Sequence, residues 1–87
     1  MGADALDQMK EWLEDEIENR SLFIATLKAG AGDATSLADK EDALSLYKGA
    51  LAAAAKSPSD LDAFLAGNAT NVRGAAVSKM WGGLKGS

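Results

Sequence analysis

The chain contains neither cysteine nor histidine. Without cysteine it forms no disulfide and offers no thiolate for catalysis or for most zinc sites. Without histidine it lacks the side chain that most often acts as a general base at neutral pH and as a metal ligand. The sequence therefore predicts a protein that is not an enzyme and that holds neither a metal nor a cofactor.

Long hydrophobic runs are also missing. The longest unbroken apolar stretch, Ala50–Ala55, is far shorter than the roughly 20 residues that span a membrane. The N-terminal segment is acidic and amphipathic, unlike a secretory signal. We therefore expect no signal peptide and no transmembrane segment, and a location in the cytoplasm or within a protein assembly.

Residues that favour strands are scarce. Valine and isoleucine together number four and threonine three, among 87 residues dominated by helix formers. Apolar residues make up 47% of the chain, but 18 of these 41 are alanine, which buries little area. We expect one all-α domain, 1–87, with a thin core. It should be a small irregular three- or four-helix bundle or helical hairpin with short C-terminal helices.

Hydrophobic spacing predicts a long amphipathic first helix. Its apolar stripe and the flanks of that stripe follow helical periodicity and comprise Leu6, Leu13, Ile17, Ile24, Met9, Trp12, Phe23 and Leu27. Two residues depart from the pattern, because Arg20 lies within the stripe and Leu22 lies outside it.

A glycine-rich break follows this helix. In the run "AGAGD", Gly30 or Gly32 can adopt the left-handed conformation that ends a helix, and Thr35 or Ser36 can cap the next one. The second helix carries leucines at heptad spacing with a tyrosine beside them: Leu37, Leu44, Leu51 and Tyr47.

Two further breaks define the short helices. Ser57 is typical of an N-cap and Pro58 of a first helical position, and Thr70 or Asn71 can cap the last helix. The glycine pair at 82–83 is expected to stop that helix. The predicted helices therefore span about 3–28, 36–56, 58–66 and 71–81.

Charge is distributed unevenly. Residues 1–62 hold thirteen acids against six Lys and Arg, whereas residues 63–87 hold three cations and no acid. The acidic bulk argues against nucleic-acid binding, which needs a basic footprint. The basic tail complements the acidic face of the first helix, as charge-steered association requires. The predicted partner-binding residues are Arg73, Val77, Lys79, Met80, Trp81, Leu84 and Lys85 in the tail, and Glu11, Glu14, Asp15 and Glu18 in the first helix.

Three interpretations remain open for the tail. As a first, the apolar face around Trp81 completes the domain's own core; as a second, it docks on another subunit, since tryptophan and arginine often anchor interfaces. The third is a membrane-surface helix, for which the tail is short and weakly charged and the acidic body would be repelled by anionic lipid. The second interpretation predicts a non-enzymatic structural, assembly or adaptor protein that acts through helix-mediated contacts, for example in a phage particle or a secretion assembly. The partner is another protein or a second copy, and no small-molecule ligand is expected.

The stretch "DATSLAD" supports an alternative. It resembles the modification site of acyl and peptidyl carrier proteins, which are small acidic four-helix domains. Ser36 and Leu37 stand at the predicted start of the second helix with Asp33 upstream, where those proteins carry a pantetheine arm on serine. The resemblance implies a cofactor attached to Ser36. Carrier families have a long loop before that serine, whereas a short alanine-glycine turn precedes it here.

Overall fold

The computed structural model describes residues 2–30 and 37–86, and it is entirely helical over these ranges apart from short turns. The helices are α1 (Gly2–Lys28), α2 (Leu37–Lys56), α3 (Pro58–Gly67) and α4 (Val72–Lys85). The all-α prediction is confirmed, and each helix begins within one residue of its predicted start.

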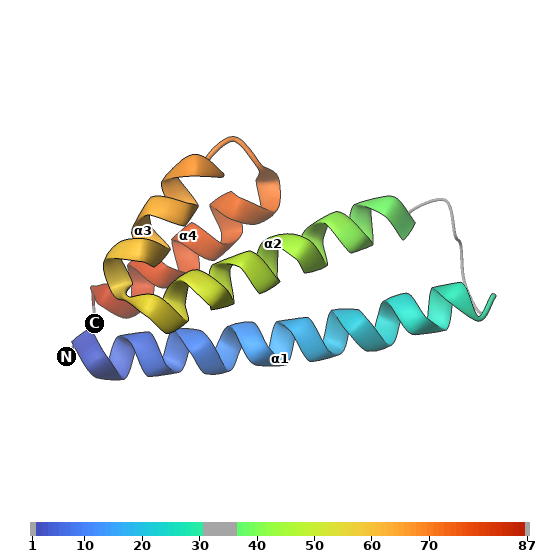
Figure 1. The fold of residues 1–87 in the computed structure, drawn as a ribbon, viewed down its shortest axis with the longest axis horizontal. Coiled ribbons are helices and arrows are strands. Elements are labelled where there is room, and N and C mark those ends of the chain that lie inside the picture. The colour runs from blue at the N-terminus through green and yellow to red at the C-terminus, as the bar shows by residue number, and fades with distance from the viewer. Residues whose placement is uncertain (1, 31–36, 87) are drawn as a thin grey trace.

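The four helices form two antiparallel hairpins of unequal length (Figure 1). α1 and α2 make the long hairpin and share the most extensive contact, while α3 packs on α2 and α4 packs on α1. The short hairpin covers only one end, so the C-terminal half of α1 and the N-terminal half of α2 project beyond it as an arm (Figure 1). The molecule is accordingly elongated, 44 × 24 × 21 Å.

One hydrophobic core lies where all four helices meet. Its most enclosed side chains come from three helices and are Met9, Leu13, Leu61 and Val77. α2 contributes mainly small residues, because Ala43, Ala50 and Ala54 are buried. Short side chains on the buried line let α2 approach its neighbours closely.

The heptad leucines of α2 do not form its buried line. Leu37, Leu44 and Leu51 are only partly buried, whereas Leu46 and Tyr47 are buried together with the alanines. The reason is that α2 packs against both α1 and α3. The helix positions that face both neighbours hold Ala43, Tyr47, Ala50 and Ala54, and the heptad leucines remain only partly buried.

Three predicted helix boundaries have the expected chemistry. Gly30 follows α1 with a φ of 84°, a left-handed conformation that glycine adopts without strain. The Ser57 side chain accepts a hydrogen bond from the Asp60 backbone N–H at 3.0 Å, which caps α3. The Asn71 side chain accepts from the N–H of Arg73 at 2.8 Å and caps α4.

The prediction that Gly82 and Gly83 end the last helix was wrong. α4 continues through both glycines to Lys85. Each glycine costs about 1 kcal/mol in a helix interior. Contacts beyond them offset this cost, because Leu84 packs on the core and Lys85 bonds to Asp62 on α3.

Candidate protein-binding surface

Two of the tail's predicted partner-binding residues lie in the core. Val77 is fully buried and Trp81 is 3% exposed. For these two residues the structure therefore shows the core interpretation, because neither side chain offers surface to a partner. Gly74 continues the same buried line of α4, where a Cβ atom would collide with the backbone oxygen of Asn68.

A polar contact on α3 holds the end of α4. Asp62 Oδ1 accepts a 2.7 Å hydrogen bond from Trp81 Nε1 and a 3.0 Å bond from Lys85 Nζ. The bond from Lys85, followed by that from Trp81, lowers the pKa of the Asp62 carboxyl below its ordinary value, against a smaller opposing effect of burial. Lys85 is thus engaged within the chain and is a weaker candidate for partner binding than the sequence indicated.

An apolar groove runs between α1 and α4. We call it the α1–α4 groove; it has a volume of about 460 Å³ and is lined by Trp12, Ala76, Lys79, Met80, Gly83 and Leu84. Met80 and Leu84 are only partly buried, so their side chains pack on the core and still form the groove wall. Lys79 is exposed and forms no ion pair within the described part of the chain. The predicted residues Lys79, Met80 and Leu84 are thereby brought together.

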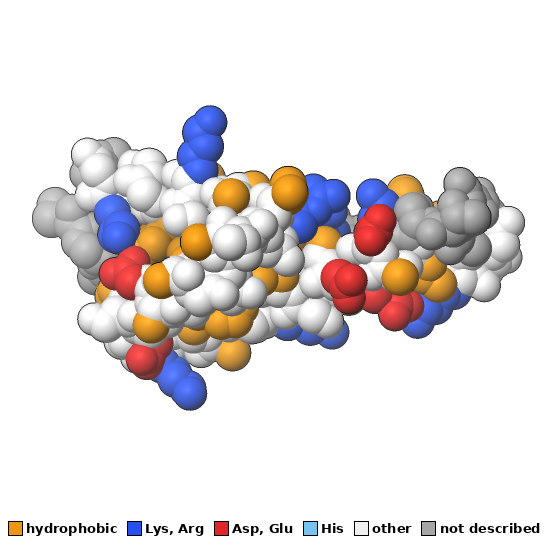
Figure 2. All heavy atoms as spheres, turned by 90° about the horizontal axis from the view of Figure 1, so that it is seen from above, with side chains coloured by type: hydrophobic (Ala, Val, Ile, Leu, Met, Phe, Trp, Pro, Cys, Tyr) orange, Lys and Arg blue, Asp and Glu red, His pale blue; other side chains and the backbone are white. Residues whose placement is uncertain are grey.

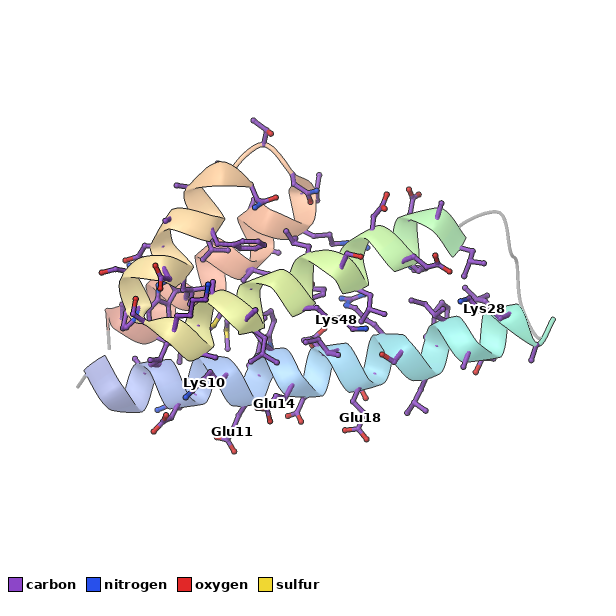
Figure 3. The ribbon with its side chains drawn as sticks, in the orientation of Figure 1. Lys10, Glu11, Glu14, Glu18, Lys28 and Lys48 are labelled. Atoms are coloured by element: carbon purple, nitrogen blue, oxygen red, sulfur yellow. The ribbon has the colours of Figure 1, made fainter. Side chains whose placement is uncertain are left out.

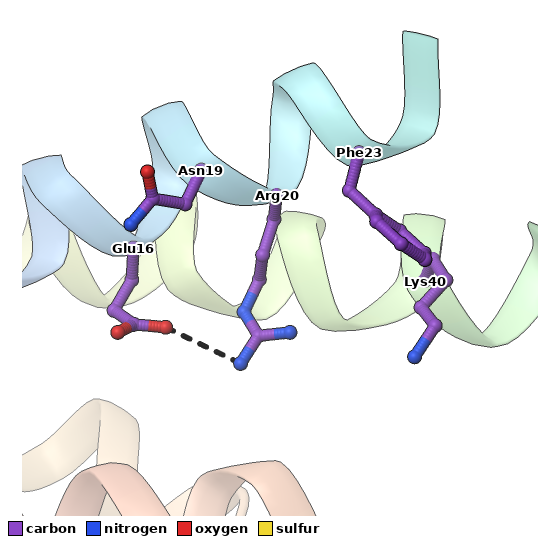
Figure 4. A pocket seen from close by; sticks show the side chains of 5 residues that line it. All are labelled: Glu16, Asn19, Arg20, Phe23 and Lys40. Atoms are coloured by element: carbon purple, nitrogen blue, oxygen red, sulfur yellow. Dashed lines mark ion pairs between the residues drawn. The ribbon is translucent and has the colours of Figure 1, made fainter. Parts of the chain in front are cut away.

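A second hollow, the basic pocket, lies further along α1. It measures about 280 Å³ and is lined by Glu16, Asn19, Arg20, Phe23 and Lys40 (Figure 4). Glu16 Oε2 pairs with Arg20 Nη2 at 3.2 Å, and Lys40 Nζ stands 5.4 Å from the Phe23 ring centroid. After the Glu16–Arg20 pair is formed, Lys40 remains as the cation without a carboxylate partner in the described residues.

Arg20 can lie within the apolar stripe of α1 because its guanidinium group packs on the ring of Tyr47 and bonds to its hydroxyl. The guanidinium lies 4.7 Å from the Tyr47 ring centroid and donates a 3.3 Å hydrogen bond to the Tyr47 hydroxyl. Trp12 meets the same ring edge-on at 5.9 Å. The Arg20 Nε atom is buried without a hydrogen-bond partner. Tyr47 therefore links α2 to both the groove and the basic pocket.

The groove and the basic pocket belong to one surface. Trp12, Glu16, Asn19 and Phe23 follow one another at spacings of three or four residues, which places them on one side of α1. Trp12 lines the groove and the other three line the basic pocket. A helix laid along this side of α1 passes from an apolar end to a basic end.

The acidic residues of α1 that the sequence predicted to bind a partner lie on its exposed side. Figure 3 shows Glu11, Glu14 and Glu18 projecting from the outer side of α1. These three and Asp15 are exposed and have no ion pair within the described residues. The structure does not place them beside the basic tail of the same chain, so their charge is open to another molecule.

Two exposed apolar residues of the arm were missing from the predicted site. Leu22 is 62% exposed and Phe23 is 50% exposed. The sequence assigned Phe23 to the flank of the apolar stripe, but α3 and α4 do not reach the arm to cover it. Leu22 carried a visible signal, because a leucine outside the apolar stripe and beside acids is expected to be exposed.

Arg73 lies apart from the α1–α4 groove. It borders a hollow of about 520 Å³ between α4 and the arm, together with Asp39, Asp42 and the 82% exposed Val72. Figure 2 shows acidic, basic and hydrophobic side chains over both the arm and the short hairpin. Because Asp39 and Asp42 line the same hollow, the positive charge of Arg73 is less available to a partner than the sequence indicated.

Ser36, Thr35 and Gly32 lie outside the described residues, so the carrier-protein interpretation stays a prediction. Among residues 2–30 and 37–86, no cluster of acidic side chains is arranged to hold a metal ion. Within the same ranges no helix combines the length and the apolar character needed to span a membrane.

Comparison with known proteins identified no relative of this chain. No family model, no curated protein and no solved structure matches the chain. The surface geometry is therefore the basis for a functional proposal.

Proposed function

We propose that this protein is a non-enzymatic structural, assembly or adaptor protein that acts through helix-mediated contacts with protein surfaces. The observation that carries the proposal is the α1–α4 groove. Trp12, Met80 and Leu84 present apolar surface there without being fully buried, and Lys79 stands at the rim. Such grooves suit an amphipathic helix, which places apolar anchors inside and charged residues along the edge.

The rest of the surface supports a binding role. Leu22, Phe23 and Val72 are exposed by half or more of their area and are available for contact with a partner. The acids of α1 add a charged face beside the groove. A protein partner or a second copy can use both features, whereas a small molecule would bury few of them.

Site-specific photo-crosslinking tests this function. A benzophenone amino acid at Ala76, which lines the groove, is compared in cells of the source with the same residue at exposed Ala52 on α2. We expect a discrete protein adduct from position 76 only, and its loss when Met80→Glu is added to a chain that remains helical. Equal adducts from both positions, or none from position 76, would contradict the proposal.

A further inference from the structure

Resting on the function proposed above, we propose that the occupant of the groove is a second copy of this chain, joined head-to-tail. One side of α1, which we call the α1 strip, carries Glu11, Asp15, Glu18 and Leu22. The strip of one copy lies along the α1–α4 groove and the basic pocket of the next. Its leucine enters the apolar end and its acids face the basic end.

The residues of the α1 strip lie along one side of the helix, in a line roughly parallel to its axis. With a rotation of about 100° per residue, its four positions fall within a sector of about 60°. All four side chains are exposed, and the three acids have no ion pair among the described residues. Leu22 is 62% exposed, so the strip offers one apolar side chain at the end of a line of three acids.

The strip and its receiving surface match in length and in order. Glu11 and Leu22 are eleven residues apart, as are Trp12 and Phe23, so each surface extends about 16 Å along its helix. Antiparallel docking sets Leu22 of one copy against Trp12 and Met80 of the other. The same placement brings Glu11 close to the Lys40 end of the basic pocket.

Charge complementarity favours the α1 strip as the occupant of this surface. Lys40 and Lys79 are the cations of the receiving surface without an ion pair in the described chain, and the strip supplies three carboxylates. The whole chain has a net charge of −4, so a second copy is repelled in most other orientations. The association should therefore weaken with salt, because exposed charge pairs are screened.

The arrangement also determines the type of assembly. The strip and the receiving surface occupy sides of α1 about 100° apart, so they are two different patches on each copy. A contact between different patches is heterologous, and it leaves one strip and one groove free at the ends. Copies therefore add to open chains rather than closing as a two-fold dimer.

Sedimentation velocity from about 1 µM to about 1 mM tests the contact in chains confirmed to be folded by circular dichroism. Wild-type protein should give species heavier than a dimer as concentration rises. Leu22→Lys and Gly83→Glu should each weaken association roughly hundredfold, because a charge replaces an apolar contact. The matched controls are Ala52→Lys, on the exposed side of α2, and Gly82→Glu, beside the groove but outside its lining. Both should associate like wild type.

Mixing the two disabled variants gives the decisive result. Leu22→Lys retains an intact groove and Gly83→Glu retains an intact strip. Each alone should be monomeric, whereas the mixture should form a 1:1 complex of two chains that cannot grow. A mixture that stays monomeric while wild type assembles would overturn the head-to-tail contact.

Each of the other possible results overturns a stated part of the proposals. A closed wild-type dimer that does not grow overturns the heterologous arrangement. Assembly that is indifferent to Leu22→Lys overturns the register. A monomer at about 1 mM overturns self-association. If position 76 then crosslinks to a different protein, the proposed function stands and only the second copy is excluded. A monomer without any adduct from position 76 overturns both proposals.

Discussion

Trp81 Nε1 donates a 2.7 Å hydrogen bond to Asp62 Oδ1, and this bond joins α4 to α3 across the short hairpin. The indole is buried, whereas half of the Asp62 side chain is open to solvent. One carboxylate thus satisfies the only polar atom of the largest core side chain and also pairs with Lys85. The contact is polar, yet it determines how an apolar residue lies in the core.

Removing the acceptor should destabilise the hairpin. We expect Asp62→Ala to lower the free energy of unfolding by about 1–2 kcal/mol, because the buried indole N–H loses its partner. Trp81→Ala should cost about 3–5 kcal/mol through the cavity it leaves. Urea unfolding followed by far-UV circular dichroism measures both. A larger loss for Asp62→Ala than for Trp81→Ala would contradict the assignment of Trp81 to the core.

The Asp62 contact should depend on pH. Its pKa is lowered in the folded state, first by Lys85 and then by Trp81, so its contribution is present above the unfolded pKa and is lost as pH falls through the folded value. Asp62→Asn keeps an acceptor for the indole but cannot titrate. The stability advantage of wild type over Asp62→Asn should therefore shrink as pH falls below about 4. Urea midpoints measured at neutral and acid pH check this, and an unchanged difference would refute it.

Two glycines of α4 should respond in opposite directions to the same substitution. A Cβ atom at Gly82 meets nothing within 4 Å, so Gly82→Ala should raise stability by about 0.5–1 kcal/mol through better helix propensity. Gly74→Ala should lower it by about 1–3 kcal/mol, because the Cβ atom collides with the Asn68 carbonyl oxygen. Thermal unfolding of both variants decides whether α4 continues past residue 81 as described.

The ring of Tyr47 should matter more to the stability of the long hairpin than its hydroxyl. It is 2% exposed and contacts Trp12 and Arg20. Tyr47→Phe removes the hydroxyl that Arg20 donates to and should cost only about 1 kcal/mol. Tyr47→Ala removes the ring and should cost about 3–5 kcal/mol. Denaturant midpoints give both values, and a similar loss for the two variants would show that the hydroxyl, not the ring, dominates.

Local signals predicted three helix boundaries. Ser57 with Pro58, Asn71 and Gly30 act over three or four neighbouring residues, and the structure confirms each of them. The end of α4 could not be predicted this way. The contact that carries the helix beyond Gly82 and Gly83 joins Lys85 to Asp62, which are far apart in sequence.

Burial, too, could be predicted where it depends on local spacing and could not where it depends on distant contacts. The spacing of Met9, Leu13 and Ile24 predicted the inner side of α1, because period alone decides which residues share a side. It did not predict that Phe23 is half exposed, since that depends on where the short hairpin ends. Nor did it distinguish core from interface at Trp81.

By itself, the sequence determined the helical class, the helix starts and the separation of acids from the apolar side of α1, because propensity, capping and periodicity act over a few residues. Only the tertiary structure decided which faces remain uncovered. A short hairpin of α3 and α4 packed on a longer one buries Val77 and Trp81, leaves Leu22 and Phe23 exposed, and opens the groove beside Trp12. Those outcomes depend on distances between helices, which no local pattern encodes.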